Sequence, residues 1–329
     1  MICLGIEGTA HTISVGIVDK VDEKCKILSH ISRTYKPEGG GIHPREAANH
    51  HAKHIPSIIE ESIEKANIDV KEIDIIGFSI GPGLGPCLRT AATSARTLAL
   101  LLKKPIVGVN HCIAHLEIGR ALTKCNDPVL LYVSGGNTQV IAFMRGRYRV
   151  FGETLDIGIG NCLDKFGREI GLSFPAGPKI EKLAKKGNKY ISLPYSVKGM
   201  DVSFSGILTA CIHLLKKERI EDICYSLQET CFSMLAEVTE RAMAHTEKEE
   251  VLLGGGVACN ERLKEIIKKM AQERNAKFFS PPNELLVDNG VMIAWTALLM
   301  YASGIEHKIE ETNIKQNYRT DEVEIKWRN

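Results

Sequence analysis

Short apolar runs alternate with longer amphipathic stretches along the chain. Apolar runs at residues 2–6, 13–18 and 26–31 are followed by a helical pattern over residues 45–66. A further apolar run at residues 73–80 ends in Gly-Pro-Gly-Leu-Gly-Pro. Runs of this length predict buried β-strands, and strands that alternate with helices are typical of α/β domains.

The same pattern starts again near the middle of the chain. Residues 128–133 form an apolar run, residues 134–137 a polar turn with two glycines, and residues 138–143 a second apolar run. Later, residues 250–253 predict a strand that ends in three glycines, and residues 260–274 predict a helix. The repetition therefore predicts two related α/β domains.

Length and composition fit this organisation. A chain of 329 residues suggests about two domains, and we expect the first to comprise residues 1–122 with about 290–329 and the second residues 123–289. The 42 Lys and Arg residues nearly balance the 40 Asp and Glu residues, which argues against a protein that binds nucleic acid through charged tails. Glu7 interrupts the apolar N-terminus, and no two of the ten cysteines form a Cys-x-x-Cys pair. We therefore expect a cytoplasmic protein with reduced cysteines and no membrane span.

Three glycine-containing turns follow predicted strands, at residues 7–10, 134–137 and 254–256. Glycine lets the backbone approach a ligand closely, and the exposed N–H groups of such turns bind anions. Each turn alone is more often structural, so the inference of a nucleotide site depends on their order in one chain. No Gly-x-x-x-x-Gly-Lys-Ser/Thr motif occurs, which excludes a P-loop protein. The candidates for phosphate binding in these turns are Glu7, Thr9, Asn137, Gly255 and Gly256.

His111 and His115 are four residues apart, directly after Asn110, a residue type that favours helix N-caps. This spacing puts both imidazoles on one face of a helix, as a bidentate metal site requires. The pair lacks the Glu of the His-Glu-x-x-His metalloproteases, and an isolated pair of this kind is more often structural. From the residues alone, both interpretations stay open.

Four segments together resemble a known protein family. They are Gly-Ile-Glu-Gly-Thr-Ala at residues 5–10, Asn-His-Cys-Ile-Ala-His at 110–115, Tyr-Val-Ser-Gly-Gly-Asn-Thr at 132–138 and Gly-Gly-Gly-Val-Ala-Cys-Asn at 254–260. The turns resemble the superfamily of actin, sugar kinases and heat-shock chaperone ATPases. Jointly, the segments resemble the tRNA N6-adenosine threonylcarbamoyltransferases, and Glu-Gly-Thr-Ala is similar to the archaeal and eukaryotic type, the catalytic subunit of the KEOPS complex. The resemblance implies two tandem actin-like (ribonuclease H-like) domains with a nucleotide cleft between them.

The resemblance also implies a metal site. It adds Tyr132 and Asp288 to His111 and His115 as ligands of one divalent metal per subunit. Fe(II) is the metal that the family implies, whereas the donor atoms alone leave zinc and manganese open.

An adenine nucleotide or threonylcarbamoyl-AMP is the ligand that the resemblance implies for the cleft. The residues that would contact it are Tyr132, Val133, Ser134, Gly135, Gly136, Asp164, Gly177, Glu181 and Asn260. Without the resemblance, we expect Asp164 and Glu181 to be solvated helix carboxylates and Asn260 to be a helix N-cap.

The activity implied by the resemblance is transfer of a threonylcarbamoyl group from its adenylate to the N6 amine of the adenosine next to the anticodon. AMP leaves, the metal assists, and we expect no protein general base. The implied partners are tRNA and KEOPS subunits, namely a small kinase-like ATPase, its regulator and a dimerising subunit, with neither DNA nor membrane. Lys103, Lys104 and the lysines of residues 179–186 are candidates for RNA phosphate contacts.

Three alternatives remain at this point. An O-carbamoyltransferase or small-molecule kinase could use the same fold, although Glu7 replaces the Asp that kinases of this superfamily carry in the first turn. An actin-like ATP-binding switch would not need His111 and His115, and a metalloprotease would need the missing Glu. A second histidine group, His50, His51 and His54, is expected at the surface or at a partner contact.

Overall fold

The computed structural model describes residues 1–37 and 40–328, which fall into two compact units. The first unit contains Met1–Lys124, Arg145–Tyr148 and Asp288–Asn329, and the second contains Cys125–Met144 and Arg149–Val287. The chain therefore passes between the units after Lys124, Met144, Tyr148 and Val287.

A five-stranded mixed sheet forms the centre of the first unit. Its order is β3-β2-β1-β4-β5, where β1, β2 and β3 are antiparallel neighbours and β1, β4 and β5 are parallel neighbours. The strands are β1 (Ile2–Glu7), β2 (Thr12–Val21), β3 (Lys24–Thr34), β4 (Ile75–Gly81) and β5 (Ile106–Asn110). The strand expected at residues 73–80 starts only at Ile75, because Val70–Glu72 forms a 3-10 turn that ends at Ile73.

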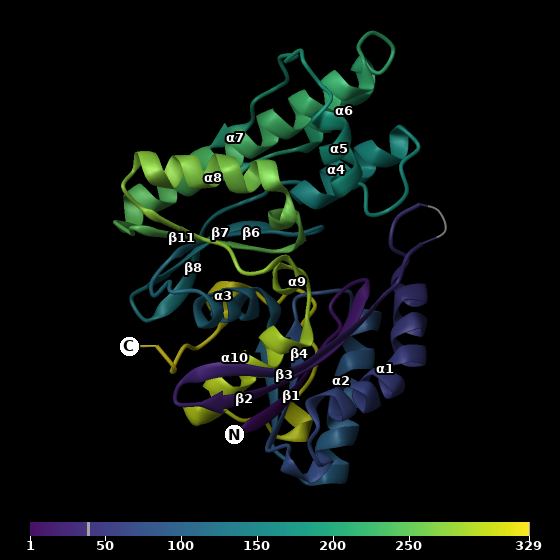
Figure 1. The fold of residues 1–329 in the computed structure, drawn as a ribbon, viewed down its shortest axis with the longest axis vertical. Helices are drawn as coiled ribbons and strands as arrows, with labels where there is room; N and C mark the ends of the chain where they lie inside the picture. The colour runs from purple at the N-terminus through teal and green to yellow at the C-terminus, as the bar shows by residue number, and fades with distance from the viewer. Residues whose placement is uncertain (38–39, 329) are drawn as a thin grey trace. The chain divides into compact units, whose positions relative to one another are not determined.

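The helices of the first unit are α1 (Pro44–Ala66), α2 (Gly85–Leu102), α3 (His111–Leu122) and α10 (Gly290–Ala302). Helices α1 and α2 pack against each other, and α1 also covers β2 and β3. Helix α10 packs against β1, β2 and β4 (Figure 1). Alternating apolar residues of β1 and β2, such as Leu4, Ile6, Val15 and Ile17, are fully buried in this core.

Glycines let α10 lie directly on the backbone of the sheet. A Cβ on Gly16 would lie 2.3 Å from the backbone nitrogen of Val291, and one on Gly5 would lie 2.3 Å from that of Ala294. On the helix side, a Cβ on Gly290 would lie 2.2 Å from the nitrogen of Gly16. Since real Cβ atoms do not approach so closely, larger side chains would push the start of α10 off the sheet.

The second unit contains a sheet with the equivalent order, β8-β7-β6-β11-β12. Its strands are β6 (Val129–Val133), β7 (Thr138–Met144), β8 (Arg147–Glu153), β11 (Glu250–Gly254) and β12 (Lys277–Phe279), and the first two residues of β8 belong to the first unit. Strands β6 and β7 are antiparallel, whereas β6, β11 and β12 are parallel. Two sheets of the same order confirm the prediction of two related α/β halves.

Six helices accompany this sheet in the described part of the chain. They are α4 (Ile159–Glu169), α5 (Gly177–Ala184), α6 (Ser205–Leu214), α7 (Ile220–Thr246), α8 (Glu261–Glu273) and α9 (Asn283–Leu286). A small hairpin of β9 (Val197–Lys198) and β10 (Asp201–Val202), which the sequence pattern did not predict, is separate from the main sheet. No described helix is both long and apolar enough to cross a membrane. The ten cysteines all lie among the described residues, where none of them forms a disulfide, and eight of them are buried.

Candidate metal centre and nucleotide-binding residues

Helix α3 carries the histidine pair and starts directly after β5. The Asn110 side chain accepts hydrogen bonds from the backbone nitrogens of Cys112 (3.0 Å) and Ile113 (3.2 Å), which confirms the predicted N-cap. The rings of His111 and His115 lie 4.9 Å apart at an interplanar angle of 85°, and both side chains are buried. The helix therefore presents two imidazoles side by side, as the spacing predicted.

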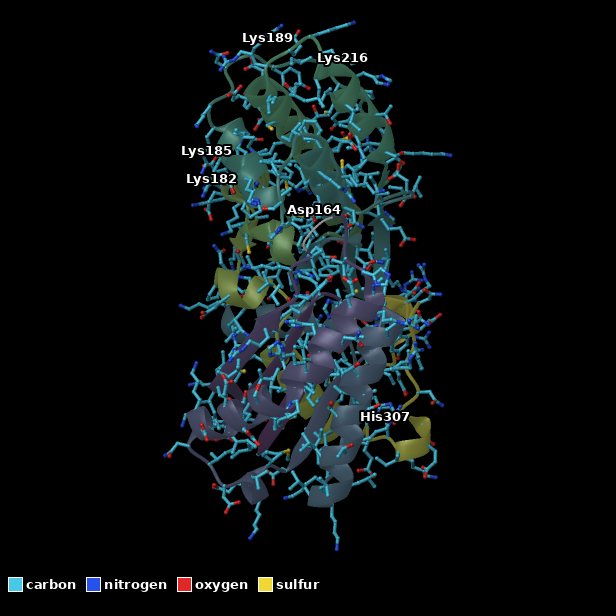
Figure 2. The ribbon with its side chains drawn as sticks, turned by 90° about the vertical axis from the view of Figure 1, so that its right-hand side faces the viewer. Asp164, Lys182, Lys185, Lys189, Lys216 and His307 are labelled. Carbon is cyan, nitrogen blue, oxygen red and sulfur yellow. The ribbon has the colours of Figure 1, made fainter. Side chains whose placement is uncertain are left out.

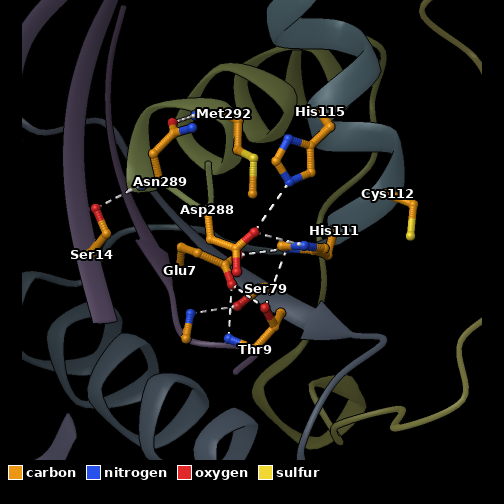
Figure 3. Close-up of polar contacts among 12 residues, drawn as sticks. Glu7, Thr9, Ser14, Ser79, His111, Cys112, His115, Asp288, Asn289 and Met292 are labelled. Carbon is orange, nitrogen blue, oxygen red and sulfur yellow. Dashed lines mark hydrogen bonds and ion pairs between the residues drawn. The ribbon is translucent and has the colours of Figure 1, made fainter. Parts of the chain in front are cut away.

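The carboxylate of Asp288, at the bend before α10, faces both imidazoles (Figure 3). Its Oδ1 is 3.4 Å from Nε2 of His111 and 3.4 Å from Nε2 of His115. The three side chains offer one ligand atom each within 4.8 Å of one another. Two imidazole nitrogens and one carboxylate oxygen suit zinc or iron, so the three residues can hold a divalent metal.

The pKa shifts of His115 and Asp288 favour the protonation states in which these two side chains bind a metal. Burial lowers the pKa of His115, which keeps its imidazole neutral. Burial alone would raise the pKa of Asp288, but the facing imidazole of His111, followed by that of His115, outweighs it and holds this pKa well below its usual range. Neutral imidazoles and an ionised carboxylate are the forms that coordinate metals.

Glu7 and Thr9, expected in a phosphate-binding turn, make contacts next to the metal cluster. Glu7 is fully buried at the end of β1, and its Oε2 lies 3.0 Å from Nδ1 of His111. Its Oε1 accepts hydrogen bonds from the backbone nitrogen (2.8 Å) and hydroxyl of Thr9. Sequence reasoning missed the contact between Glu7 and His111, because 104 positions separate the two residues and no local pattern links them.

The turn between β6 and β7 holds the next group of candidates. The backbone nitrogen of Ser134 donates to the carbonyl oxygen of Asn137 (2.8 Å), and the nitrogen of Asn137 donates to the Ser134 hydroxyl (3.1 Å). Gly135 and Gly136 are exposed, and among the described residues neither N–H group is used in a hydrogen bond. These two N–H groups are therefore available to an anionic ligand.

Two other segments of the second unit lie against this turn. At the start of α4, the nitrogens of Gly160 and Asn161 donate to the carbonyl oxygens of Ser134 (3.1 Å) and Gly135 (2.9 Å). Gly255 has a φ of +91°, and a Cβ on it would lie 2.3 Å from the carbonyl oxygen of Val133. Only glycine fits both the angle and the space, and Gly256 next to it begins the 3-10 turn Gly256–Cys259. The structure thus brings the turns at residues 134–137 and 254–256 together, next to Val133.

The remaining nucleotide candidates are engaged within the second unit. Oδ1 of Asp164 accepts a hydrogen bond from the backbone nitrogen of Ala176 (2.7 Å), directly before Gly177 starts α5. Glu181 on α5 accepts a long hydrogen bond from the nitrogen of Glu261 (3.3 Å).

Asn260 is the N-cap of α8, as expected without the resemblance. Its side-chain oxygen accepts from the nitrogens of Arg262 (2.9 Å) and Leu263 (3.2 Å), and its amide nitrogen donates to Gln228 (2.9 Å). Its expected role in nucleotide binding stays a prediction. The expected role of Tyr132 in binding the metal and the nucleotide also stays a prediction. Tyr132 is buried near the end of β6 in the second unit, whereas the other three expected metal ligands belong to the first unit.

Several exposed lysines extend from the second unit (Figure 2). Lys182 and Lys185 lie on α5, and Lys185 pairs with Glu181 at 3.3 Å. Lys189 makes an ion pair of 2.8 Å with Glu218. Part of this positive charge is therefore neutralised within the unit, and the lysines remain only candidates for phosphate contacts.

The second histidine group differs from the expectation in one respect. His50 and His54 are partly exposed, with their rings 4.5 Å apart, but His51 is fully buried. The surface position expected for His51 is therefore wrong, because this residue turns toward the sheet and packs close to Gly8.

Comparisons with known proteins identify the family of this chain. A family model described as tRNA N6-adenosine threonylcarbamoyltransferase matches residues 26–295. The chain is 59% identical over 329 residues to the tRNA N6-adenosine threonylcarbamoyltransferase of Thermococcus sibiricus, covering 99% of this chain and 100% of the relative. It is 60% identical to a probable bifunctional tRNA threonylcarbamoyladenosine biosynthesis protein of Methanothermobacter thermautotrophicus, of whose length it spans 61%.

Similar solved structures support the fold. HypF of T. kodakarensis matches with a TM-score of 0.67 and 16% identity over 92% of this chain and 48% of HypF. Component A of the (R)-2-hydroxyglutaryl-CoA dehydratase of Acidaminococcus fermentans matches with a TM-score of 0.60 and 14% identity over 92% of this chain and 99% of component A. These structures share the actin-like fold, which confirms the predicted fold class. With sequence identity near 60% over the whole chain, this protein belongs to the tRNA N6-adenosine threonylcarbamoyltransferase family.

Proposed function

We propose that this chain transfers the threonylcarbamoyl group from threonylcarbamoyl-AMP to the N6 amine of the adenosine next to the anticodon. The substrates are tRNAs that read codons beginning with A, and the second product is AMP. The observation that carries the proposal is the buried cluster of His111, His115 and Asp288, in a chain that belongs to this family over its whole length. An actin-like switch protein would not need His111 and His115.

The cluster fits a divalent metal by its donor atoms, and we propose Fe(II), with zinc as the alternative. His111, His115 and Asp288 would hold the ion, with Tyr132 as the fourth ligand. When bound, the ion supplies a Lewis acid that polarises and orients the acyl group.

The chain's own residues bind and orient the rest of the adenylate. The N–H groups of Gly135 and Gly136 bind the phosphate. Negative charge grows on this phosphate as the bond between the carbamoyl carbon and the phosphate oxygen breaks, and the N–H groups stabilise it. Asp164, Glu181 and Asn260 hold the nucleoside. The new bond joins N6 to the carbamoyl carbon, and N6 loses its proton to water, since no protein general base is proposed.

We also propose the setting of the reaction. The protein acts in the cytoplasm on tRNA, together with the KEOPS subunits that the resemblance implies: the kinase-like ATPase, its regulator and the dimerising subunit. The two actin-like domains are those expected at residues 1–122 with about 290–329 and at residues 123–289, with Asp288 and Arg145–Tyr148 assigned to the first, as in the compact units. The nucleotide cleft expected between them stays a prediction.

The test is a reconstituted reaction. The chain is incubated with its partner subunits, the adenylate-forming enzyme, bicarbonate, threonine, ATP and unmodified tRNA, and the nucleosides are analysed by mass spectrometry. Threonylcarbamoyladenosine is expected with the wild type and not with His111→Ala. His213→Ala, which removes an exposed imidazole from α6, serves as the matched control and should keep full activity. Unmodified tRNA in the complete wild-type reaction, or full activity of His111→Ala, would contradict the proposal.

A further inference from the structure

We infer that Glu7 is a positioning residue for the metal centre: its carboxylate holds Nδ1 of His111, so that Nε2 of the same ring is fixed toward the metal. The inference rests on the metal site proposed above and assigns Glu7 a role other than phosphate binding. It follows from the contacts of three side chains, Glu7, Thr9 and His111 (Figure 3).

The Glu7 carboxylate is held on both oxygens. Oε2 meets Nδ1 of His111 at 3.0 Å, while Oε1 accepts two hydrogen bonds from Thr9, one from its backbone nitrogen and one from its hydroxyl. The side chain is fully buried. Burying a carboxylate without partners costs much free energy, so these contacts are needed to keep the Glu7 carboxylate in its buried position.

The backbone around Glu7 is fixed as well. Glu7 ends β1, which pairs with β2 on one side and β4 on the other. The next backbone nitrogen, of Gly8, donates to the hydroxyl of Ser79 on β4 (3.1 Å). The carboxylate therefore extends from a rigid part of the sheet.

The contact with Glu7 affects which nitrogen of the His111 ring can bind the metal. A carboxylate only accepts hydrogen bonds, and Oε2 of Glu7 is closer to Nδ1 of His111 (3.0 Å) than Oδ1 of Asp288 is to Nε2 (3.4 Å). The Glu7 contact therefore favours the ring form with its proton on Nδ1 and its lone pair on Nε2. Nε2 is the atom that lies 3.4 Å from Oδ1 of Asp288. Carboxylate–histidine–metal arrangements of this kind fix the ring and make the nitrogen a stronger donor.

The length of the Glu7 side chain matters for this role. Glu7→Asp shortens it by one carbon–carbon bond of about 1.5 Å, whereas the present contact to Nδ1 is already 3.0 Å. The aspartate variant cannot reach His111 without moving β1. Glu7→Gln keeps the shape and one oxygen but loses the charge.

Metal binding by the purified protein tests the inference without the reaction. Metal-free wild type and variants are titrated with Co(II), whose visible bands report ligand geometry, and with Zn(II) in competition with a chelating dye. We expect Kd to rise about 10- to 100-fold for Glu7→Asp and less for Glu7→Gln, with shifted Co(II) bands in both. His111→Ala, which removes a ligand, should lose this binding.

Glu117→Gln is the matched control. Glu117 is a second buried carboxylate, on the same helix as the two histidines, and it binds Arg120 and Trp327 instead of a metal ligand. This variant should lower the thermal midpoint but keep the wild-type Kd and Co(II) spectrum.

The outcomes separate this inference from the proposed function. If His111→Ala binds metal as the wild type does, the proposed metal site is wrong and the role of Glu7 falls with it. If His111→Ala loses the metal while both Glu7 variants keep the wild-type Kd and spectrum, the metal site stands and the positioning role alone is overturned. Folding failure of Glu7→Asp leaves Glu7→Gln, which has nearly the same volume, to decide.

Discussion

Gly16→Ala should disturb the metal centre from a distance, because it acts on the contact between β2 and α10. The added Cβ would lie 2.3 Å from the nitrogen of Val291, 2.6 Å from the carbonyl carbon of Gly290 and 2.7 Å from the Cα of Val291. All three are backbone atoms, which cannot rotate away as a side chain can. The start of α10 must therefore move by about 1 Å to reach ordinary van der Waals contact.

The size of the effect follows from that displacement. Overpacking of this kind costs about 1–3 kcal/mol, and the hydrogen bond from the Gly290 nitrogen to the Ser14 hydroxyl, now 3.0 Å, is weakened as well. Each kcal/mol lowers the melting temperature of a unit of this size by about 2–4 °C. Asp288 lies two residues before α10, and metal–ligand distances tolerate only about 0.2 Å of change. We therefore expect both a lower melting temperature and at least tenfold weaker metal binding.

Circular dichroism melting curves and Co(II) titration measure the two effects. The control is Gly206→Ala, where a Cβ on α6 would meet no atom within 4 Å, so neither quantity should fall. A wild-type melting temperature for Gly16→Ala would refute the close packing of α10 on β2. A lowered melting temperature with unchanged Co(II) affinity would refute the link between α10 and the position of Asp288.

Three further predictions concern side chains outside the metal cluster. Burial tends to raise the pKa of Asp156, but hydrogen bonds, first among them that of Ser205, outweigh it and lower this pKa from its ordinary value of 3.8 to about 2. The ionised carboxylate therefore stabilises the fold fully above pH 3.8, and this stabilisation is lost as the pH falls through about 2. In urea unfolding, Asp156→Asn should be less stable than the wild type at neutral pH, and the difference should shrink as the pH falls toward 2. Asn260→Ala should cost about 1–3 kcal/mol in the same assay, because it removes the α8 N-cap and leaves Gln228 without its partner; wild-type stability would contradict this. Tyr148→Phe removes a hydroxyl that donates to a buried carboxylate and should cost about 1–3 kcal/mol, seen as a lower melting temperature, and an unchanged value would show that this contact is dispensable.

The sequence predicted those parts of the fold that depend on local pattern. Apolar runs located β1 to β4 in the first sheet and β6, β7 and β11 in the second, whereas β12 was not predicted. The spacing of His111 and His115 gave their common helix face. The hairpin of β9 and β10 was missed, because strands of two residues carry no periodicity. The order of the strands could not be predicted from the pattern either, because β1 pairs with β4 through residues that are far apart in the sequence, such as Cys3 and Ile75.

In the candidate site, too, the sequence pattern predicted only contacts between residues that are close in the sequence. Asn110 could be predicted as an N-cap because its partners are two and three residues away. Asp288 became a ligand candidate only through the resemblance, since 173 positions separate it from His115. Glu7 and His111 each lie in a segment that carries the resemblance, but nothing in either segment indicates that the two side chains meet. Long-range contacts are set by packing of the whole unit, which single-residue patterns do not encode.

The course of the chain gives the three metal-binding side chains unequal mechanical freedom. His111 and His115 share one helix, so their separation changes only if the helix itself deforms. Asp288 is the first residue after the chain returns from the second unit, and a single peptide bond joins it to Val287. A change in the backbone at Val287 therefore acts on this carboxylate through one peptide bond, and a bound ion would in turn restrain the backbone at that crossing.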